Sequence, residues 1–163
     1  RSLDAGAHDH PLAGLVSEDL EQRLRAIEDR IAIQDLIARY GPAVDAGIEE
    51  KVSELWDDDG WYRIDGAELT APGIGSLVHL DTHRDYLDAG CAHLLSAPRV
   101  EIDGETAVAV NHSCVLTRSD GQWNAVRVSA NRWELVRTSE GWRVHGRTAR
   151  LLDGSTDARA LLS

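Results

Sequence analysis

The sequence has little sulfur and little positive charge. Its 163 residues contain two cysteines, Cys91 and Cys114, and no methionine or phenylalanine. Two cysteines make neither a disulfide framework nor a metal-ligand set, so nothing here demands an oxidising compartment. Lys and Arg number 17 against 28 Asp and Glu, and the formal net charge is −11. This balance opposes binding to the phosphates of nucleic acid or of anionic lipid, so neither is an expected partner.

The sequence also lacks a long apolar run. None approaches the roughly 20 residues of a membrane span, and no charged-then-apolar leader precedes a small-residue cleavage site. We therefore expect a cytoplasmic protein without a membrane partner. A chain of this length fits one domain that removes roughly 68–70% of its unfolded surface from water, which is enough for a core with a cavity.

Three segments follow from composition and periodicity. Residues 1–16 mix Gly, Pro, Asp and His without a period and predict a flexible N-terminal arm. Residues 17–152 carry helical and strand patterns and form the predicted domain. Residues 153–163 are a short predicted tail.

A long amphipathic helix is predicted from Ser17, which suits an N-cap, to about Arg39. Its apolar residues recur at helical spacing: Leu20, Leu24, Ile27, Ile31, Ile33, Leu36, Ile37 and Tyr40. Pro42 has no N–H to donate and disfavours helical geometry at Gly41, so a kink or a fresh turn follows. Asp45 comes next, among small and apolar neighbours.

The middle of the chain alternates short elements. We expect a short helix over 49–56, an acidic turn at 57–60, a hairpin of 61–64 with 67–70, and a second helix from 74 to about 88. His79 and His83 stand four residues apart on that second helix, as two zinc ligands can. Zinc would need further ligands, and the intervening residues do not give His-Glu-x-x-His, so no metal is predicted.

The last part of the chain reads as a meander of long strands. The strands are predicted over 91–102, 107–117, 123–137 and 142–151, joined by Asp-Gly and Glu-Gly turns. The fold class is therefore α+β, with helices first and one mostly antiparallel sheet curled over them.

Alternation along these strands assigns side chains to the two faces of the sheet. The odd-numbered face collects polar residues in addition to Cys91: His93, Asn111, Ser113, Ser129 and Asn131. His112 has the opposite parity and is expected outside the pocket. The parity of His145 is compatible with a position at the mouth of the pocket. Because both faces are partly apolar, one should cover the helices and the other should meet a second subunit. We expect a homo-oligomer, a dimer or a trimer.

Several motifs resemble the SnoaL-like branch of the nuclear transport factor 2-like superfamily. They are Ile-Gln-Asp-Leu-Ile-Ala-Arg-Tyr (33–40), Val-Asp-Ala-Gly (44–47), Leu-Trp-Asp-Asp-Asp-Gly (55–60) and Asn-Arg-Trp-Glu-Leu-Val-Arg-Thr-Ser-Glu-Gly-Trp-Arg-Val (131–144). Members include scytalone dehydratase, hexachlorocyclohexane dehydrochlorinase, bile-acid dehydratase, polyketide cyclases, ketosteroid isomerase and proteins without chemistry. The resemblance implies a cone-shaped α+β barrel, with N-terminal helices packed in the curved sheet around a deep pocket.

The resemblance also implies a catalytic His–Asp dyad made by His93 and Asp45. It places Arg147 in the pocket, and it places Tyr40, Tyr62, Ser129 and Asn131 where relatives hold substrate-contacting groups. Cys91 shares the inward face with His93 and is taken as pocket lining.

Elementary chemistry agrees with such a dyad. Imidazole starts with a pKa near working pH, and a carboxylate bonded to one ring nitrogen fixes its tautomer and stabilises the imidazolium. We therefore expect a lyase of the dehydratase type, without metal or organic cofactor, acting on a small, largely apolar cyclic or polyketide-like substrate. Two alternatives stay open: an isomerase or polyketide cyclase that uses the same dyad, and a non-catalytic protein that binds a small ligand.

Overall fold

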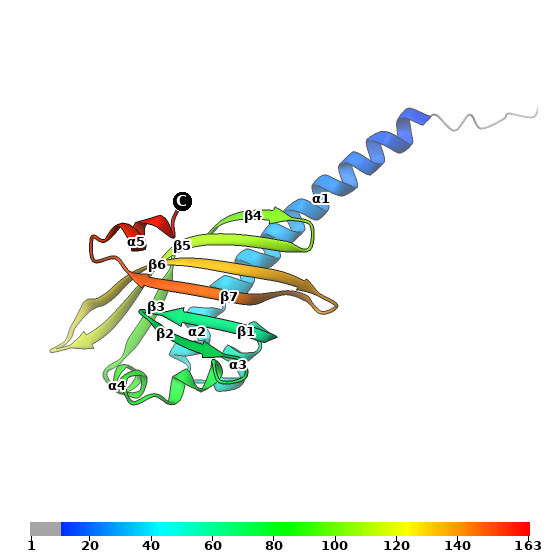
Figure 1. The fold of residues 1–163 in the computed structure, drawn as a ribbon. Coiled ribbons are helices and arrows are strands. Elements are labelled where there is room, and N and C mark those ends of the chain that lie inside the picture. Colours follow the sequence, from blue (N-terminus) through cyan, green and yellow to red (C-terminus); the bar gives the residue numbers. More distant parts are fainter. Residues whose placement is uncertain (1–10) are drawn as a thin grey trace, which may run out of the picture.

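The computed structural model describes residues 11–163, with side chains from residue 17 onward (Figure 1). The first helix, α1, spans Pro11–Ala38. It begins before Ser17 because Pro11 fits the first helical position, where a missing N–H costs no hydrogen bond. Residues 11–16 of the predicted arm are thus helical, and residues 1–10 lie outside the described residues.

Five further helical elements and seven strands follow α1. They are α2 (Tyr40–Asp45), α3 (Glu49–Ser53), β1 (Trp56–Ile64), β2 (Ala67–Thr70), the 3-10 helix η1 (Gly75–His79), α4 (Asp81–Ala89), β3 (Cys91–Leu95), β4 (Arg99–Asp103), β5 (Thr106–Ser119), β6 (Gln122–Thr138), β7 (Gly141–Leu151) and α5 (Thr156–Ala160).

Several predicted boundaries are corrected. The predicted acidic turn at 57–60 is part of β1, which has a register shift against β7 between Trp56 and Trp61. The second predicted helix is divided into η1 and α4, because Leu80 between them is extended, with φ −63° and ψ 139°. The predicted tail contains α5, whose Ala158 is buried.

The seven strands form one open, curved sheet in the order β2-β1-β7-β6-β5-β3, and β4 also pairs with β5. All pairs are antiparallel except β1 with β7, which is parallel. The strand predicted over 91–102 is interrupted at residues 96–98, where Pro98 has no N–H for the ladder. Both halves still pair with β5, and the mixed α+β cone is confirmed.

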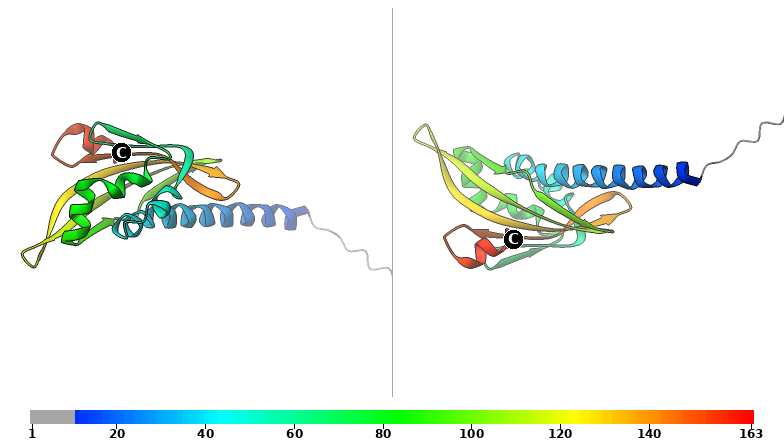
Figure 2. Two further views of the ribbon diagram at one scale, coloured as in Figure 1. Left: turned by 90° about the horizontal axis from the view of Figure 1, so that it is seen from below. Right: turned by 90° about the horizontal axis from the view of Figure 1, so that it is seen from above.

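The helices α1 and α5 lie on opposite sides of the sheet (Figure 2). The second half of α1 and the short α2 pack on the inner side, where Ile33, Leu36, Ile37 and Val44 are fully buried or nearly so. Trp133 from β6 is also fully buried in this core. The core is therefore held between the helices and the concave face of the sheet, as expected for an amphipathic helix on a half-buried sheet.

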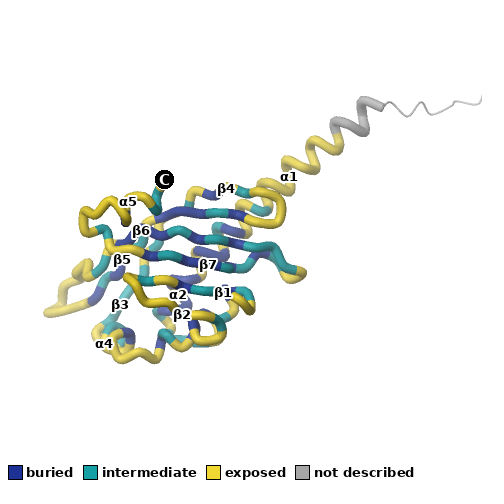
Figure 3. The backbone as a smooth tube through the Cα atoms, viewed as in Figure 1, coloured by how far each residue is buried: buried dark blue, intermediate teal, exposed yellow. Residues whose placement is uncertain are grey.

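Between residues 17 and 32, α1 extends away from the domain and is mostly exposed (Figure 3). Four large apolar residues of this stretch remain 52–60% accessible to solvent: Leu20, Leu24, Ile27 and Ile31. The predicted apolar face is thus used inside this chain only from Ile33 onward. No helix described within residues 11–163 is long and apolar enough to cross a membrane.

Candidate active site

The inner face of the sheet carries the polar residues that alternation assigned to it. His93 on β3 is in register with Val115 on β5, which is in register with Arg127 on β6. One step further along, Ser113 faces Ser129, and Asn111 faces Asn131. Residues from three separate strands therefore project toward the same side of the sheet.

Helix α2 delivers Asp45 to this face. Pro42 is its third residue, within the first turn, where the helix does not need a proline N–H. Gly41 packs against the main-chain carbonyl oxygen of His93 so closely that a Cβ at this position would overlap that oxygen. The Gly41-Pro42 pair thus allows α2 to lie directly on β3, with Asp45 at the end of the helix.

His93 and Asp45 are joined at two points. The ring Nδ1 of His93 lies 2.6 Å from Oδ1 of Asp45, and the main-chain N–H of His93 donates to Oδ2 at 2.8 Å. Burial raises the pKa of the Asp45 carboxyl, but the hydrogen bonds and the charge of His93 outweigh it, and the net pKa is below the ordinary 3.8. An ionised carboxylate only accepts, so Nδ1 carries the proton and Nε2 is left for chemistry.

A cavity of about 320 Å³ opens beside His93. It is lined by Tyr40, Tyr62, Ile64, Leu69, Leu77, Leu80, Thr82, His83, Tyr86, His93, Leu95, Ser113, Val115, Arg127, Ser129, Arg147 and Ala149. Five of the residues proposed from the sequence are on this wall. The size and the mixture of apolar surface with a few polar groups are typical of small-molecule sites.

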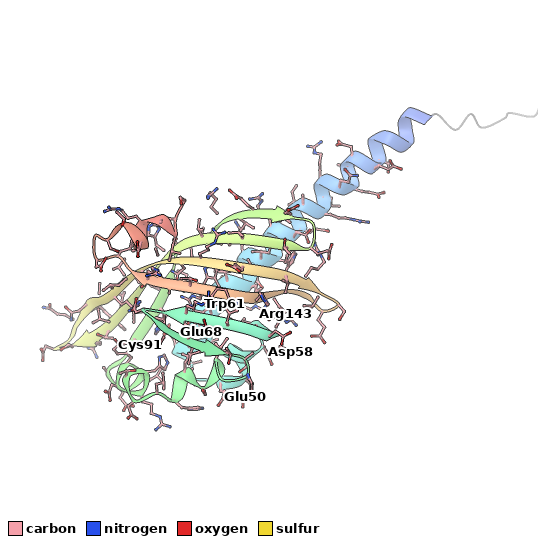
Figure 4. The ribbon with its side chains drawn as sticks, viewed as in Figure 1. Glu50, Asp58, Trp61, Glu68, Cys91 and Arg143 are labelled. Atoms are coloured by element: carbon pink, nitrogen blue, oxygen red, sulfur yellow. The ribbon has the colours of Figure 1, made fainter. Side chains whose placement is uncertain are left out.

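Asn131 and Cys91, for which substrate contact is expected from the sequence, are not among the residues that line this cavity, and each bonds to another residue of the candidate site. The Oδ1 atom of Asn131 accepts from Nε and Nη2 of Arg147, at 3.2 and 2.8 Å. The Cys91 thiol, at the start of β3 (Figure 4), donates to Asp45 Oδ1 at 3.5 Å. Burial and the Asp45 carboxylate raise the pKa of this thiol to about 11, so it stays protonated at neutral pH.

Arg147 is 3% exposed and sits among aromatic rings. Its guanidinium carbon lies 4.1 Å from the ring centre of Tyr40, 4.6 Å from that of Tyr62 and 4.2 Å from that of Trp133. The face of an aromatic ring attracts a cation, so this cage fixes the guanidinium beside the cavity. Burial, the largest effect, raises the pKa of the Tyr62 hydroxyl and keeps it a hydrogen-bond donor.

The sequence reasoning missed His83 and Arg127. His83 is buried, its Nε2 is 2.8 Å from the Val44 carbonyl oxygen, and its ring centre lies 5.6 Å from that of His93. A carbonyl oxygen only accepts, so Nε2 is the protonated nitrogen of His83, and Nδ1 has no hydrogen-bond partner among the described residues. The helical spacing of His79 and His83 suggests a zinc site and gives no sign that His83 lines the cavity. Arg127 has the same parity as Ser129 on the same strand, and this parity places its side chain on the inner face of the sheet.

His145 is not part of the described cavity wall. Its Nδ1 lies 2.9 Å from Oδ2 of Asp57, near the start of β1. The register between β6 and β7 shifts between Glu134 and Leu135, next to His145. Such a bulge interrupts strict alternation, which is why parity fails at this position.

Asp45, Cys91 and His93 also offer three ligand atoms within 4.8 Å of one another, close enough for a metal ion. Hydrogen bonds already join these atoms, and a thiol ligand would have to lose its proton. The donor set fits a hydrogen-bonded dyad better than a metal centre, and a metal-free site stays a prediction.

The fold and the cavity define a cone-shaped protein of the nuclear transport factor 2-like superfamily. The chain belongs to the SnoaL-like domain family, whose model matches residues 25–148. A search of curated protein sequences found no match.

Solved structures give the same picture of the fold. An NTF2-like protein with a cystatin-like fold from Novosphingobium aromaticivorans is 44% identical, with a TM-score of 0.87 over 96% of this chain and 99% of that one. A hexachlorocyclohexane dehydrochlorinase, LinA-type3 from Novosphingobium barchaimii, is 19% identical, with a TM-score of 0.67 over 80% and 90%. Aln2 from a Streptomyces species is 20% identical, with a TM-score of 0.69 over 80% and 94%. The last two similarities show the fold alone.

Proposed function

We propose that this protein is a cofactor-independent lyase of the dehydratase type. Its substrate is a small, largely apolar cyclic or polyketide-like molecule, and His93 is the general base. The observation that carries the proposal is the 2.6 Å contact between His93 Nδ1 and Asp45 Oδ1 at the wall of an otherwise largely apolar cavity. The name of the dehydrochlorinase among the structural neighbours denotes an elimination, which agrees with this class of reaction.

In this mechanism, Nε2 of His93 takes a proton from a substrate carbon next to a carbonyl. The electron pair of that C–H bond forms the new double bond as the leaving group departs with its own bonding pair. Asp45 holds the ring and stabilises the imidazolium that results. The hydroxyls of Tyr40 and Tyr62 and the guanidinium of Arg147 line the same cavity and donate to the carbonyl or leaving oxygen.

The test is a screen of small cyclic β-hydroxy carbonyl compounds by mass spectrometry, which detects the loss of one water. Against a substrate found in this way, His93→Ala and Asp45→Asn should each lower kcat by about 10²–10⁴-fold, the usual range for general-base catalysis. His112→Ala is the matched control because His112 is an exposed histidine on the outer face of the same sheet. If both variants kept full turnover, the proposed dyad would be rejected.

His83 favours a second candidate, an isomerase or polyketide cyclase. A second imidazole 5.6 Å from that of His93 gives the cavity two groups that can exchange a proton with a bound enolate. The product then keeps every atom of the substrate, so product mass separates this reaction from elimination. A non-catalytic ligand-binding protein would show neither product.

We also propose that the protein is cytoplasmic and forms a dimer through α1. The exposed apolar residues of α1 repeat with the 4-3-4 spacing of coiled-coil core positions: Leu20, Leu24, Ile27 and Ile31. In a parallel pair with a second copy, Arg23 of one copy faces Glu28 of the other, whereas an antiparallel pair sets like charges together. The charge pattern therefore favours a parallel pair.

A further inference from the structure

Three buried polar atoms of the cavity wall have no hydrogen-bond partner within residues 17–163. They are Nη1 of Arg147, Oγ of Ser129 and Nη2 of Arg127. Buried polar groups in proteins are nearly always paired, because an unpaired one loses its interaction with water and gains nothing. Three such atoms around one cavity indicate that a ligand supplies their partners.

The charge of Arg147 points to the same conclusion. Its partners are the neutral amide oxygen of Asn131 and three aromatic rings, and no carboxylate of the described residues forms an ion pair with it. Two other residues of the wall do have acidic partners. Arg127 pairs with Asp65 at 2.5 Å, and His93 is bonded to Asp45. A buried cation without a counter-ion is unfavourable, so an anion that enters the cavity is strongly attracted to Arg147.

The unpaired atoms come from neighbouring positions of the sheet. Arg127 and Ser129 are successive inward residues of β6, and the next inward residue, Asn131, holds the side chain of Arg147 on β7. The charges of Arg147 and Arg127 both act on the Tyr62 hydroxyl, where they oppose the rise in pKa caused by burial. Both arginines line the same cavity as Ser129 and Tyr62. We call these three residues the basic wall (Arg127, Ser129 and Arg147).

The rest of the cavity is mostly apolar. Its hydrocarbon side chains are Ile64, Leu69, Leu77, Leu80, Leu95, Val115 and Ala149. A ligand that matches this distribution has an apolar body and one negatively charged end. The whole protein carries a net charge of −11 and repels anions in general, so such recognition depends on the local basic wall.

We propose that the basic wall binds a carboxylate carried by the substrate, which makes the substrate a small organic acid with an apolar body. A guanidinium matches a carboxylate in geometry as well as in charge. The inference rests on the proposed function in one respect, because it takes the molecule that binds in the cavity to be the substrate. It assigns Arg147 to the charged end of the substrate, and it leaves the hydroxyls of Tyr40 and Tyr62 as the donors to the carbonyl or leaving oxygen.

The test compares two probes of nearly equal shape, 2-naphthoate and 2-naphthamide, by isothermal titration calorimetry. The wild-type protein should bind the carboxylate at least about tenfold more tightly than the neutral amide, since one ion-paired contact corresponds to that factor or more. Arg147→Gln should remove most of this difference and leave binding of 2-naphthamide nearly unchanged.

Two further variants make the comparison specific. Arg150→Gln is the matched control, because Arg150 is an exposed arginine of the same strand with the opposite parity. It should change the affinity for 2-naphthoate less than about twofold. Ser129→Ala removes one donor without a change in charge and should weaken 2-naphthoate binding by about three- to tenfold. It also tests the wall if Arg147→Gln does not fold.

The proposal is overturned if wild-type protein binds 2-naphthamide as tightly as 2-naphthoate, if neither probe binds in the millimolar range, or if Arg147→Gln and Arg150→Gln have equal effects. His93→Ala separates this result from the proposed reaction. It should retain the preference for 2-naphthoate while it lowers kcat by about 10²–10⁴-fold. A protein that prefers the carboxylate but keeps turnover in His93→Ala would support the wall and reject the base.

Discussion

Gly41 and His93 touch through their backbones, with no room for a side-chain carbon between them. The Cα of Gly41 faces the carbonyl oxygen of His93, and an added Cβ would overlap that oxygen. Four residues further along α2, Asp45 bonds both the ring and the main-chain N–H of the same histidine. The close approach at Gly41 is what brings the acid and the imidazole together.

Gly41→Ala should therefore separate α2 from β3. Overpacking against a backbone atom that cannot move aside costs about 1–3 kcal/mol of unfolding free energy, which urea denaturation measures. The hydrogen-bonded ring proton of His93 should also shift or disappear in the proton NMR spectrum.

Gly104→Ala is a useful comparison for that variant. Gly104 has φ +56° and nothing within 4 Å of an added Cβ, so its replacement costs only the roughly 1–2 kcal/mol of a left-handed backbone conformation. The His93 signal should stay in place in this variant. An unchanged signal in Gly41→Ala would contradict the packing argument.

Acid should remove the stabilisation that Asp45 provides. The folded-state pKa of Asp45 lies below its ordinary value of 3.8, so its contribution is fully present above that value and is lost as pH falls through the folded pKa. The stability difference between wild type and Asp45→Asn should thus be constant near neutral pH and should shrink in acid. Urea denaturation over a pH series measures it, and a difference that persists unchanged into strong acid would refute the assignment.

Asp35→Asn provides the control for this titration. The Asp35 side chain is 71% exposed, and among the described residues its ion pair is with Arg39. Exposed ion pairs contribute little, so this variant should stay close to wild type at every pH.

Asn131→Ala should destabilise the protein although Asn131 is remote from His93 in the sheet register. Its amide oxygen is the only hydrogen-bond acceptor for Arg147 among the described residues, and the loss leaves a buried guanidinium with aromatic contacts alone. We expect about 1–3 kcal/mol less unfolding free energy. Asn124→Ala, at an exposed position of the same strand, should fall within about 0.5 kcal/mol of wild type. Equal losses in the two variants would show that Arg147 does not need Asn131.

The oligomeric state tests the exposed half of α1. A parallel dimer through this helix should become a monomer in Leu24→Glu/Ile27→Glu, because each charge would enter an apolar seam. Sedimentation velocity at micromolar concentration measures the change.

The outer face of the sheet is the competing surface, where Leu94 and Val128 are 55% and 41% exposed. Leu94→Glu/Val128→Glu should leave the dimer intact. A monomeric wild-type protein, or dissociation only in the sheet variant, would exclude the helix as the interface.

Much of the site was visible in the sequence because strands alternate. The parity of Ser129 and Asn131 placed both on the inner face together with His93, and the register of β3, β5 and β6 agrees. Parity does not show, however, whether a side chain on the inner face reaches the cavity. Ser129 reaches the cavity, whereas Asn131 stops behind Arg147 and serves as its acceptor.

Other features depended on contacts between residues distant in the chain. His83 lies in the site because α4 contacts α2, where the Val44 carbonyl oxygen accepts the Nε2–H of His83. The bulge next to His145 turned that residue toward Asp57. Neither a helical period nor a strand period contains such information.

By itself, the sequence determined the α+β class, the succession of the main helices and long strands, and the faces of most strand residues, because these follow from local periods and from turn residues. Tertiary structure alone decided which side chains meet. The contact of Asp45 with His93 requires α2 to lie against β3, and the unpaired charge of Arg147 exists only because aromatic rings and an amide, rather than a carboxylate, surround it. Burial and partner geometry are properties of the folded chain, and they convert these residues into a candidate active site.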